Sequence, residues 1–597
     1  MFRRTQFLAS ALTALVAVVL VAPPAVAAPK APAKDPVAVG RGGAVSSVDP
    51  YATEIGLNVL RRGGNAVDAA VATAAALGVT EPYSAGIGGG GFFVYYDAHT
   101  GKVHTIDGRE TAPAAMEEDS FLEAGAPIPF AEAVTSGLSV GVPGTPATWA
   151  LALDRWGSTN LRQALRPATQ LARRGFVVDE TFREQTAANA QRFAAFTSTR
   201  ELFLPGGEPP EVGSVLRNRD LARTYTLLGK RGTDYLYDGR LGEEIVATVK
   251  RPPVVPGSTL NVRPGLMEQR DLDRYRALLR APTLINYRGL TVAGMAPPSS
   301  GGSTVGEALN ILERSDLASL DRPEALHRYL EATALAFADR NRYVGDPAFV
   351  DVPLRELLSQ GFANERACLI GPTAAAKPVP PGSPDGSYLP CAAAVGSADG
   401  GGDDTGRSTT HLTTWDRWGN VVAYTLTIEQ TGGSGIVVPN RGFLLNNELT
   451  DFNFTPTQGL APDPNLPAPG KRPRSSMSPT IVLDDGAPVL AIGSPGGSMI
   501  ITTVTQTLLN RLDFGMPLLD AVAAPRASQR NTAAVSAEPA FITTWGPALT
   551  ARGHSFTSVA EIGAVTAIER RDDGRLVAVA EPVRRGGGDA GVVRPRR

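Results

Sequence analysis

The chain has 597 residues, 43% hydrophobic and 19% charged, which is the composition of a globular protein with enough apolar material for a large core. A formal net charge of -2 argues against a nucleic-acid-binding protein held by general electrostatics. Beyond the N-terminal region, no segment is long and apolar enough to span a membrane.

The N-terminus predicts a secretory signal peptide. Arg3 and Arg4 supply the positive start, residues 7–21 are apolar, and Ala25-Val26-Ala27 is a small-x-small cleavage site. Two prolines interrupt the apolar run, which is short for a transmembrane anchor. No cysteine stands at the cleavage site, so a lipid anchor is not indicated. We therefore expect a secreted protein, extracellular or periplasmic, with no membrane span after the signal is removed.

The remaining chain mixes helices with pairs of strands. Capping residues and apolar periodicity predict helices at 49–60, from the cap Asn65 to 77, and at 145–155, 160–173, 322–342 and 498–511. Strands are expected at 92–96, 103–106, 443–445, 480–483, 489–492, 566–568 and 576–579, with a hairpin around Arg417-Trp418-Gly419. This mixture favours one layered α/β fold over two independent globules.

A stretch of low complexity runs from 371 to 404, and we expect it to be flexible because it has little to bury. Of the chain's two cysteines, Cys368 lies just before this stretch and Cys391 lies within it. In an exported protein an even cysteine count fits a disulfide, so we expect the two to pair. They do not form a CxxC motif and have no histidine near them in sequence, so a zinc site there is improbable.

Two glycine motifs suggest functions that their context excludes. Residues 86–91, GIGGGG, match a dinucleotide-binding pattern, but here the glycines follow a helix and open into a strand, which is the reverse of the required order. Residues 137–141, GLSVG, match the nucleophile elbow of serine hydrolases, but VGVPG cannot continue as the helix that this motif requires.

No metal or cofactor is predicted. No pair of histidines has the HxxxH or HExxH spacing of a metal-dependent hydrolase. We expect most of the five to be surface or structural residues: His99, His104, His327, His411 and His554.

The stretch RSTTH, residues 407–411, joins the low-complexity segment to a predicted strand. One interpretation is a loop that ends at a capped strand. The other is a cleavage site before Thr409, whose new α-amino group would lie beside Oγ and act as its base. In that case Thr409 Oγ attacks the carbonyl of Ser408, and water hydrolyses the resulting ester.

Three later segments favour the second interpretation. Glu448 and Asp451 place two carboxylates three residues apart, and residues 472–478 combine arginines with serines. Residues 493–498, GSPGGS, open a predicted helix, where consecutive glycine amides can bind an oxyanion. Together they indicate acyl transfer from an amide in a pocket suited to a zwitterionic amino acid.

These residues resemble the γ-glutamyltranspeptidase family (γ-glutamyltransferases), and the likeness covers nearly the whole mature chain. The motifs that carry it are GGNAVDAAVA (63–72), GIGGGGFFVYY (86–96), IDGRETAP (106–113), PPSSGG (297–302), FADRNRYVGDP (337–347), STTH, FLLNNELTDF (443–452), KRPRSSMSPTIV (471–482) and GSPGGS (493–498).

The resemblance implies a four-layer αββα sandwich of the N-terminal nucleophile hydrolase type. It also implies self-cleavage between Ser408 and Thr409, so that residues 28–408, with a flexible 371–408 tail, form a large subunit and 409–597 a small one. The two subunits would remain together as a heterodimer in one integrated fold. Thr427 matches the threonine that hydrogen-bonds the nucleophile, and Gly496 and Gly497 match the glycines of the oxyanion hole.

The resemblance also implies a substrate and the residues that bind it. Arg109, Ser475 and Ser476 would hold the donor's α-carboxylate, since an arginine fork meets a carboxylate with two bonds. Glu448 and Asp451 would hold the α-amino group. A γ-glutamyl ester on Thr409 would then pass to water or to an amino-acid or dipeptide acceptor. Glutathione is the usual donor in the family, and no cofactor takes part.

Two departures from the family pattern affect the expected substrate. Glu429 stands where many members have an asparagine that contacts the donor, so we expect an altered donor preference. The segment after Asp451 is proline-rich and lacks the tyrosine that gates the pocket in some members. Two other readings stay open: a related acylase, of the cephalosporin acylase or poly-γ-glutamate-processing kind, and a secreted binding protein that is never cleaved.

Overall fold

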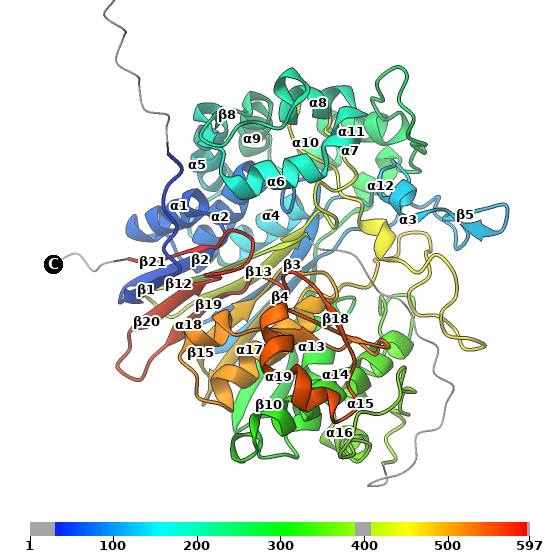
Figure 1. The fold of residues 1–597 in the computed structure, drawn as a ribbon. Helices are drawn as coiled ribbons and strands as arrows, with labels where there is room; N and C mark the ends of the chain where they lie inside the picture. Colours follow the sequence, from blue (N-terminus) through cyan, green and yellow to red (C-terminus); the bar gives the residue numbers. More distant parts are fainter. Residues whose placement is uncertain (1–29, 389–407, 594–597) are drawn as a thin grey trace, which may run out of the picture.

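Two antiparallel sheets of seven strands form the centre of the computed structural model, which describes residues 30–388 and 408–593 (Figure 1). The first sheet has the order β1 (Val37–Gly40), β20 (Leu576–Ala580), β19 (Thr566–Arg570), β15 (Ala487–Gly493), β14 (Thr480–Asp484), β11 (Leu290–Gly294) and β10 (Thr283–Tyr287). The second has the order β21 (Asp589–Val592), β2 (Gly43–Ser47), β12 (Thr410–Asp416), β13 (Val421–Thr427), β3 (Gly90–Asp97), β4 (Lys102–Gly108) and β9 (Leu278–Arg280).

The sheets pack face to face and helices cover both outer faces, which gives four layers (Figure 1). The second sheet is covered by α2 (Ala66–Thr80) and α4 (Thr145–Trp156), backed by α1 (Pro50–Arg61), α5 (Leu161–Arg174) and α9 (Arg219–Arg231). The first is covered by α13 (Gly301–Leu312), α17 (Met499–Leu512) and α18 (Leu518–Ala523), backed by α14 (Arg322–Tyr343) and α19 (Pro539–Thr550). The predicted αββα sandwich is confirmed.

Helix α2 shows how local sequence sets this arrangement. Asn65 and Asp68 form a reciprocal capping box that fixes the start of the helix. Every residue of α2 is buried, as expected for a helix that is apolar on all sides and is enclosed by a sheet and other helices. The amide of Ala66 also donates to Asp416 Oδ2 over 2.9 Å, which ties the helix to the turn between β12 and β13.

The β12–β13 hairpin lies in the middle of the second sheet, and every residue of both strands is buried. Asp416 Oδ1 accepts from the amides of Trp418 and Asn420 over 2.9 and 3.0 Å and so fixes the connecting turn. The register pairs Thr410 with Leu426. The residues that flank this pair, Thr409 and Thr427, therefore emerge together at the end of the hairpin that lies away from the turn.

Most predicted helices and strands are present to within a few residues, with one clear exception. Residues 443–445 were expected to form a strand, but they make only an isolated bridge between Leu444 and Val437. Apolar side chains were the only signal there. All three residues are buried in a loop that packs against the core, so burial rather than strand pairing explains their composition.

Residues 371–388 also differ from expectation, because they are irregular but held in place. The amide of Val379 donates to Asn531 Oδ1 over 2.7 Å, and that of Gly382 to Asp339 Oδ1 over 2.6 Å. Cys368, directly before this segment, is disulfide-bonded. Residues 1–27 of the predicted signal peptide, Cys391 and residues 389–407 lie outside the described parts of the chain. Within the described parts, no helix has the length and apolarity that crossing a membrane requires.

Candidate active site

Thr409 and Thr427 meet at the open end of the β12–β13 hairpin. Thr409 Oγ1 donates to Thr427 Oγ1 over 3.1 Å, and the amide of Glu429 donates to the same oxygen over 2.8 Å. Both threonines are nearly fully buried. The hydroxyl of Thr409 is thus held by a neighbouring strand and has one defined direction, which suits a nucleophile.

The backbone on either side of the Ser408–Thr409 bond is also fixed. Ser408 Oγ donates to the carbonyl of Tyr83 over 2.8 Å, and Arg585 Nη1 donates to the carbonyl of Thr409 over 2.8 Å. Thr409 has a φ of 100°, a region that β-branched residues rarely adopt. Conformations of this kind cost about 1–3 kcal/mol, so this part of the uncleaved chain is strained and held by its surroundings.

Gly496 and Gly497 precede helix α17, and Gly497 lines the same cavity as Thr409. Their φ values of 137° and 57° are in the range that glycine adopts without strain. The N-terminus of a helix carries partial positive charge and amides that point outward. This end of α17 is therefore suited to stabilise negative charge on an oxygen near Thr409.

Arg109 is fully buried and pairs with the carboxylates of both Glu448 and Asp451. Its guanidinium also donates to the carbonyls of Pro473 and Arg474, each over 3.1 Å. Burial alone would lower the pKa of Arg109, but the neighbouring carboxylates raise it, so the side chain stays charged. The predicted cation and the predicted anions of the site therefore neutralise one another in the structure.

Glu448 and two further carboxyl groups, Glu429 and Glu110, give this cluster unusual electrostatics. Burial raises the pKa of Glu448 to about 7, against the opposing effect of Arg109. Burial and repulsion from Asp451 and Glu448 raise the pKa of Glu429 well above its ordinary range. Burial and the neighbouring Glu448 likewise raise the pKa of Glu110. In its protonated form, Glu110 can donate a hydrogen bond to Glu448. Such shifts are typical of functional sites.

Ser475 and Ser476 are also part of the cavity. Both residues line it, and Ser476 Oγ accepts from Arg340 Nη2 over 2.9 Å. Arg340 belongs to α14, and its Nε donates to Ser300 Oγ over 2.9 Å. A second buried guanidinium is thus placed behind the serine pair.

The cavity has a volume of about 250 Å³ and brings the predicted site residues together. Its rim is the segment after Asp451, where Phe454 stacks on Phe121 with ring centroids 4.3 Å apart. The residues that line it are Arg109, Phe130, Arg340, Thr409, Thr427, Glu429, Glu448, Thr450, Asp451, Phe452, Asn453, Phe454, Thr455, Thr457, Arg474, Ser475, Ser476, Met477, Gly497, Ser498 and Ile500.

The excluded motifs lie elsewhere and have structural roles. Ser139 is buried, and its hydroxyl donates to the carbonyl of Ser136 over 3.1 Å, with no helix beginning at the serine. The glycines of 86–91 lie between α2 and β3, and a side chain on Gly88 would collide with the carbonyl of Leu444. Close backbone packing therefore explains these glycines.

A sequence profile of the γ-glutamyltranspeptidase family matches residues 52–591. The chain belongs to this family. The match includes the residues that line the cavity, the β12–β13 hairpin and most strands of both sheets, though not β1 and β2.

Relatives of established identity agree with this assignment. The chain is 40% identical to the glutathione hydrolase proenzyme of Bacillus subtilis (strain 168) over 587 residues, which cover 96% of this chain and 97% of that protein. It is 36% identical to the glutathione hydrolase proenzyme of Escherichia coli (strain K12), with 94% of each chain covered. The crystal structure of a cephalosporin acylase from Bacillus halodurans superposes with a TM-score of 0.81 at 29% identity, over 96% of this chain and 99% of that one.

The γ-glutamyltranspeptidase-type cavity contains residues that sequence reasoning did not select. Arg340 lies within a family motif, FADRNRYVGDP, but its motif lies far from Ser476 in sequence and carries no signal of a contact with it. The rim residues Asn453 and Phe454 also line the cavity. Only the packing of α14 and of the 453–470 segment against the site brings them there.

Proposed function

We propose that this protein is a secreted γ-glutamyltransferase and glutathione hydrolase with Thr409 as its nucleophile. The observation that carries the proposal is the 3.1 Å hydrogen bond from Thr409 Oγ1 to Thr427 Oγ1 at a cavity that is also lined by Arg109 and three acidic residues. Family membership supports the reaction class. The chemistry of this cavity supports the donor, a γ-glutamyl compound that keeps its free α-amino and α-carboxyl groups.

The first step would be self-cleavage. Thr409 Oγ attacks the carbonyl carbon of Ser408, the C–N bond breaks as its nitrogen takes up a proton, and an ester links the two residues. Water hydrolyses this ester and leaves a Ser408 carboxylate and a free Thr409 amine. The strained φ of Thr409 supports this step, because breaking the bond releases the strain. The names of the relatives, which are proenzymes, support it as well.

In the mature enzyme the Thr409 amine would act as the base. The ordinary pKa of an α-amino group is about 8, so near pH 8 about half of it is unprotonated and can accept the proton of Oγ. The oxygen attacks the donor's γ-carbonyl, and Gly496 and Gly497 stabilise the resulting oxyanion. The protonated amine then gives its proton to the leaving amine, and the γ-glutamyl ester is resolved by water or by an acceptor amine.

Donor binding would exchange partners within the ion cluster. The donor's α-carboxylate would take up the guanidinium of Arg109 and the hydroxyls of Ser475 and Ser476, while its α-ammonium would take the place of that guanidinium at Glu448 and Asp451. Two salt bridges inside the protein, from Arg109 to Glu448 and to Asp451, would be replaced by ionic contacts of all three residues with the substrate. Each charge stays paired, which avoids the large cost of an isolated buried ion.

Cleavage would divide the chain into residues 28–408 and 409–597, which stay associated as a heterodimer. The two parts share both sheets. In one sheet, β12 and β13 lie between β2 and β3. In the other, β14 lies beside β11 and β20 lies beside β1. We also propose that the signal sequence directs export. These points follow from the proposed cleavage site and from the sequence.

The test is a denaturing gel of purified protein with N-terminal sequencing of the smaller band. We expect two bands, the smaller one beginning at Thr409, and a single uncleaved band for Thr409→Ala. The purified wild type should hydrolyse a γ-glutamyl anilide, and Thr409→Ala should not. A wild-type chain that remains intact and inactive would contradict the proposal and would favour a binding protein.

A second candidate is an acylase that takes another acyl group. It is favoured by the likeness to a cephalosporin acylase over almost the entire chain. Arg109 separates the two candidates, because only a donor with a free α-carboxylate needs this cation. We expect Arg109→Gln to abolish turnover of the γ-glutamyl anilide. If a glutaryl anilide is a better wild-type substrate than the γ-glutamyl one, the acylase is the correct function.

A further inference from the structure

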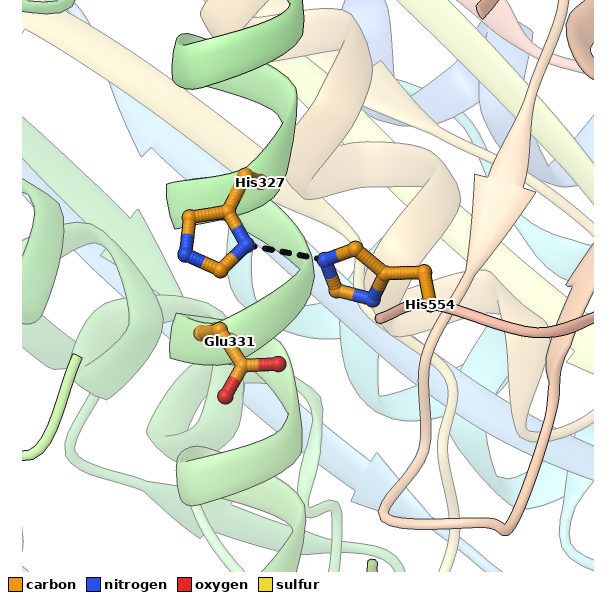
Figure 2. A group of neighbouring side chains, drawn as sticks. All are labelled: His327, Glu331 and His554. Carbon is orange, nitrogen blue, oxygen red and sulfur yellow. Dashed lines mark hydrogen bonds between the residues drawn. The ribbon is translucent and has the colours of Figure 1, made fainter. Parts of the chain in front are cut away.

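Two histidines and a glutamate form a buried cluster away from the candidate active site (Figure 2). His327 and Glu331 lie one turn apart on the same face of α14, and His554 follows α19. His327 Nδ1 and His554 Nε2 are 2.9 Å apart. One ligand atom from each of the three side chains lies within 4.8 Å of the other two.

The surroundings of His327 determine which of its nitrogens faces the cluster. His327 Nε2 lies 2.9 Å from the carbonyl of Gly371. A carbonyl can only accept a hydrogen bond, so Nε2 carries the proton and Nδ1 of the neutral ring presents a lone pair toward His554. A histidine that binds a metal through one nitrogen usually donates from the other to a carbonyl or carboxylate.

The charge state of the cluster also suits a metal. Glu331 forms an ion pair with Lys377 over 2.8 Å, and the Nδ1 atom of His327 presents its lone pair toward His554. Neutral imidazole and ionised carboxylate are the forms that bind metals. All three side chains are at least 96% buried from solvent, so a bound ion would be shielded from competing water.

Glu331 is held in place by other groups. Lys377 Nζ donates to its two carboxylate oxygens over 2.8 and 3.0 Å, and the amide of Ala375 donates over 3.1 Å. A carboxylate has about four lone-pair positions, so these bonds leave capacity for a metal. The positive charge of Lys377 opposes that of a metal ion, and for this reason we expect micromolar rather than tighter affinity.

We propose that His327 Nδ1, His554 Nε2 and the Glu331 carboxylate bind one divalent transition metal ion, with Zn²⁺ as the ion that best fits two imidazoles and a carboxylate. Bonds of about 2.0–2.1 Å in a tetrahedral site would place the two nitrogens about 3.3 Å apart, so the rings need to separate by a few tenths of an ångström. A water molecule would complete the coordination.

The metal would have a structural role. His327 and Glu331 precede the proposed cleavage site at 408–409, whereas His554 follows it, so the ion would link the large subunit to the small one. This link, though not the binding itself, rests on the proposed cleavage. Residues 371–377, which supply Gly371 and Lys377 to the cluster, belong to the segment that leads to the cleavage site.

Linear spacing gives no sign of this site, since His554 lies 227 residues from His327. The alternative is that the two histidines only pack together, and that His554 Nε2 donates a hydrogen bond to His327 Nδ1. In the first case the wild-type protein binds about one metal ion per chain, and in the second it binds none at this cluster.

The experiment uses full-length protein purified without a histidine tag, treated with a chelator, and then dialysed against micromolar ZnCl₂. Elemental analysis after gel filtration should find about one zinc per chain. Cobalt substitution should give the intense visible absorption of a tetrahedral Co²⁺ site. A wild type that retains less than about a tenth of an equivalent of zinc and has no such absorption would overturn the proposal.

Variants locate the site. His554→Gln and Glu331→Gln should each weaken zinc binding at least about 100-fold, the upper end of what is lost when only a supporting group is removed. His99→Gln, in an exposed turn, is the matched control and should bind zinc as the wild type does. Unchanged binding in His554→Gln would place the metal elsewhere and refute the assignment. If a variant fails to fold, the wild-type measurements still decide.

A last comparison separates this proposal from the proposed function. Chelation of the wild type should lower Tm while γ-glutamyl anilide hydrolysis at a lower temperature stays unchanged, because the cluster lies outside the cavity. Protein that binds zinc but is neither cleaved nor active would refute only the proposed function. Protein that is cleaved and active but does not bind zinc would refute only the metal site.

Discussion

Arg340 Nη2 donates a hydrogen bond to Ser476 Oγ over 2.9 Å, and this bond joins α14 to the wall of the cavity that we propose receives the donor's α-carboxylate. Arg340 is almost fully buried, and its Nε donates to Ser300 Oγ. The guanidinium thus orients Ser476 and brings positive charge close to the bound carboxylate. It complements Arg109, whose charge is shared with Glu448 and Asp451.

The first prediction is that Arg340→Gln impairs donor binding. A hydrogen bond to a charged group contributes about 1.5–3 kcal/mol, so kcat/KM for a γ-glutamyl anilide should fall about 10- to 100-fold, chiefly through a higher KM. Arg328→Gln, which alters a partly exposed ion pair on the same helix, should have little effect on KM. An Arg340→Gln protein with wild-type Tm and wild-type KM would show that Ser476 needs no such support.

The second prediction concerns Thr427, which accepts hydrogen bonds from both Thr409 Oγ1 and the Glu429 amide. Thr427→Val removes this acceptor at nearly constant volume. Self-cleavage should slow and kcat should fall about 10- to 100-fold, because a buried hydroxyl and a buried amide lose their acceptor, at a cost of about 1–3 kcal/mol. Thr427→Ser should restore most of both.

Thr425→Val is the matched control for Thr427, because it removes another buried hydroxyl from the same strand, one that contacts His411 instead of the nucleophile. Time courses of band splitting on a denaturing gel measure cleavage, and initial rates at saturating donor measure kcat. Equal losses in both valine variants would mean that Thr427 acts only through the stability of the sheet.

The third prediction is a pH dependence of donor binding. Burial raises the pKa of Glu448 to about 7, so a large fraction of this carboxyl is protonated below neutrality and cannot accept an ionic bond from the donor's ammonium group. As the pH rises through 7 the carboxylate forms, and KM for the donor should therefore fall. Glu448→Gln should have a higher KM that no longer changes over this range. If Glu448→Gln keeps the wild-type pH dependence of KM, another group is responsible.

The fourth prediction concerns donor selectivity through Glu429. This carboxyl accepts hydrogen bonds from Asn447 Nδ2 and Gln430 Nε2 and lines the cavity beside Thr427. Burial and the neighbouring carboxylates raise the pKa of Glu429, which makes it a poor anion in the free enzyme. An approaching ammonium group favours its ionised form, so Glu429 should matter most for donors that present one.

Glu429→Asn tests this dependence. We expect the ratio of kcat/KM for a γ-glutamyl anilide to that for an analogue without the α-amino group to fall about 10-fold, the effect of one lost ionic contact. Thr450→Val, a neighbouring cavity residue without charge, serves as the comparison. An unchanged ratio in Glu429→Asn would exclude a role in selectivity.

Sequence reasoning predicted the fold well where local rules and tertiary structure agree. The cap at Asn65, the helical pattern of 49–60 and the turn at 417–419 are local signals, and the helices and the hairpin they predict are present. Burial misled the prediction at 443–445, because an apolar run in a buried loop looks like a strand. The prediction for residues 371–388 was wrong in the opposite way. The composition of this segment gave no sign that hydrogen bonds to Asp339 on α14 and to Asn531 would hold it.

The candidate site could be selected residue by residue from family motifs, but its geometry could not. Nothing in the sequence indicates that Arg109 pairs with Glu448 and Asp451 rather than remaining open for a ligand. The contacts of Arg340 with Ser476, and of His327 with His554, likewise join segments far apart in the chain. Such pairs depend on how the layers pack, which a single sequence does not specify.

The last prediction concerns the rim of the cavity, the segment 453–465, which is organised by Asp463. The carboxylate of Asp463 accepts from the amides of Thr457 and Asn465, each over 2.8 Å, and from Asn453 Nδ2 over 2.9 and 3.0 Å. These bonds hold Asn453 and Thr457 in the cavity wall. Asp463→Asn retains the size of the side chain but replaces one oxygen acceptor by an N–H donor, so it should loosen the rim.

A looser rim admits water more easily and orders a bound acceptor less well. We therefore expect Asp463→Asn to lower the ratio of transpeptidation to hydrolysis several-fold, with donor KM changed less, because the donor contacts that we propose are the more deeply buried Arg109 and Ser475. Product analysis with a γ-glutamyl anilide and a dipeptide acceptor measures both reactions together. Asp484→Asn, an exposed substitution at the end of β14, is the control. An unchanged product ratio in Asp463→Asn would mean that the rim does not govern the choice between water and acceptor.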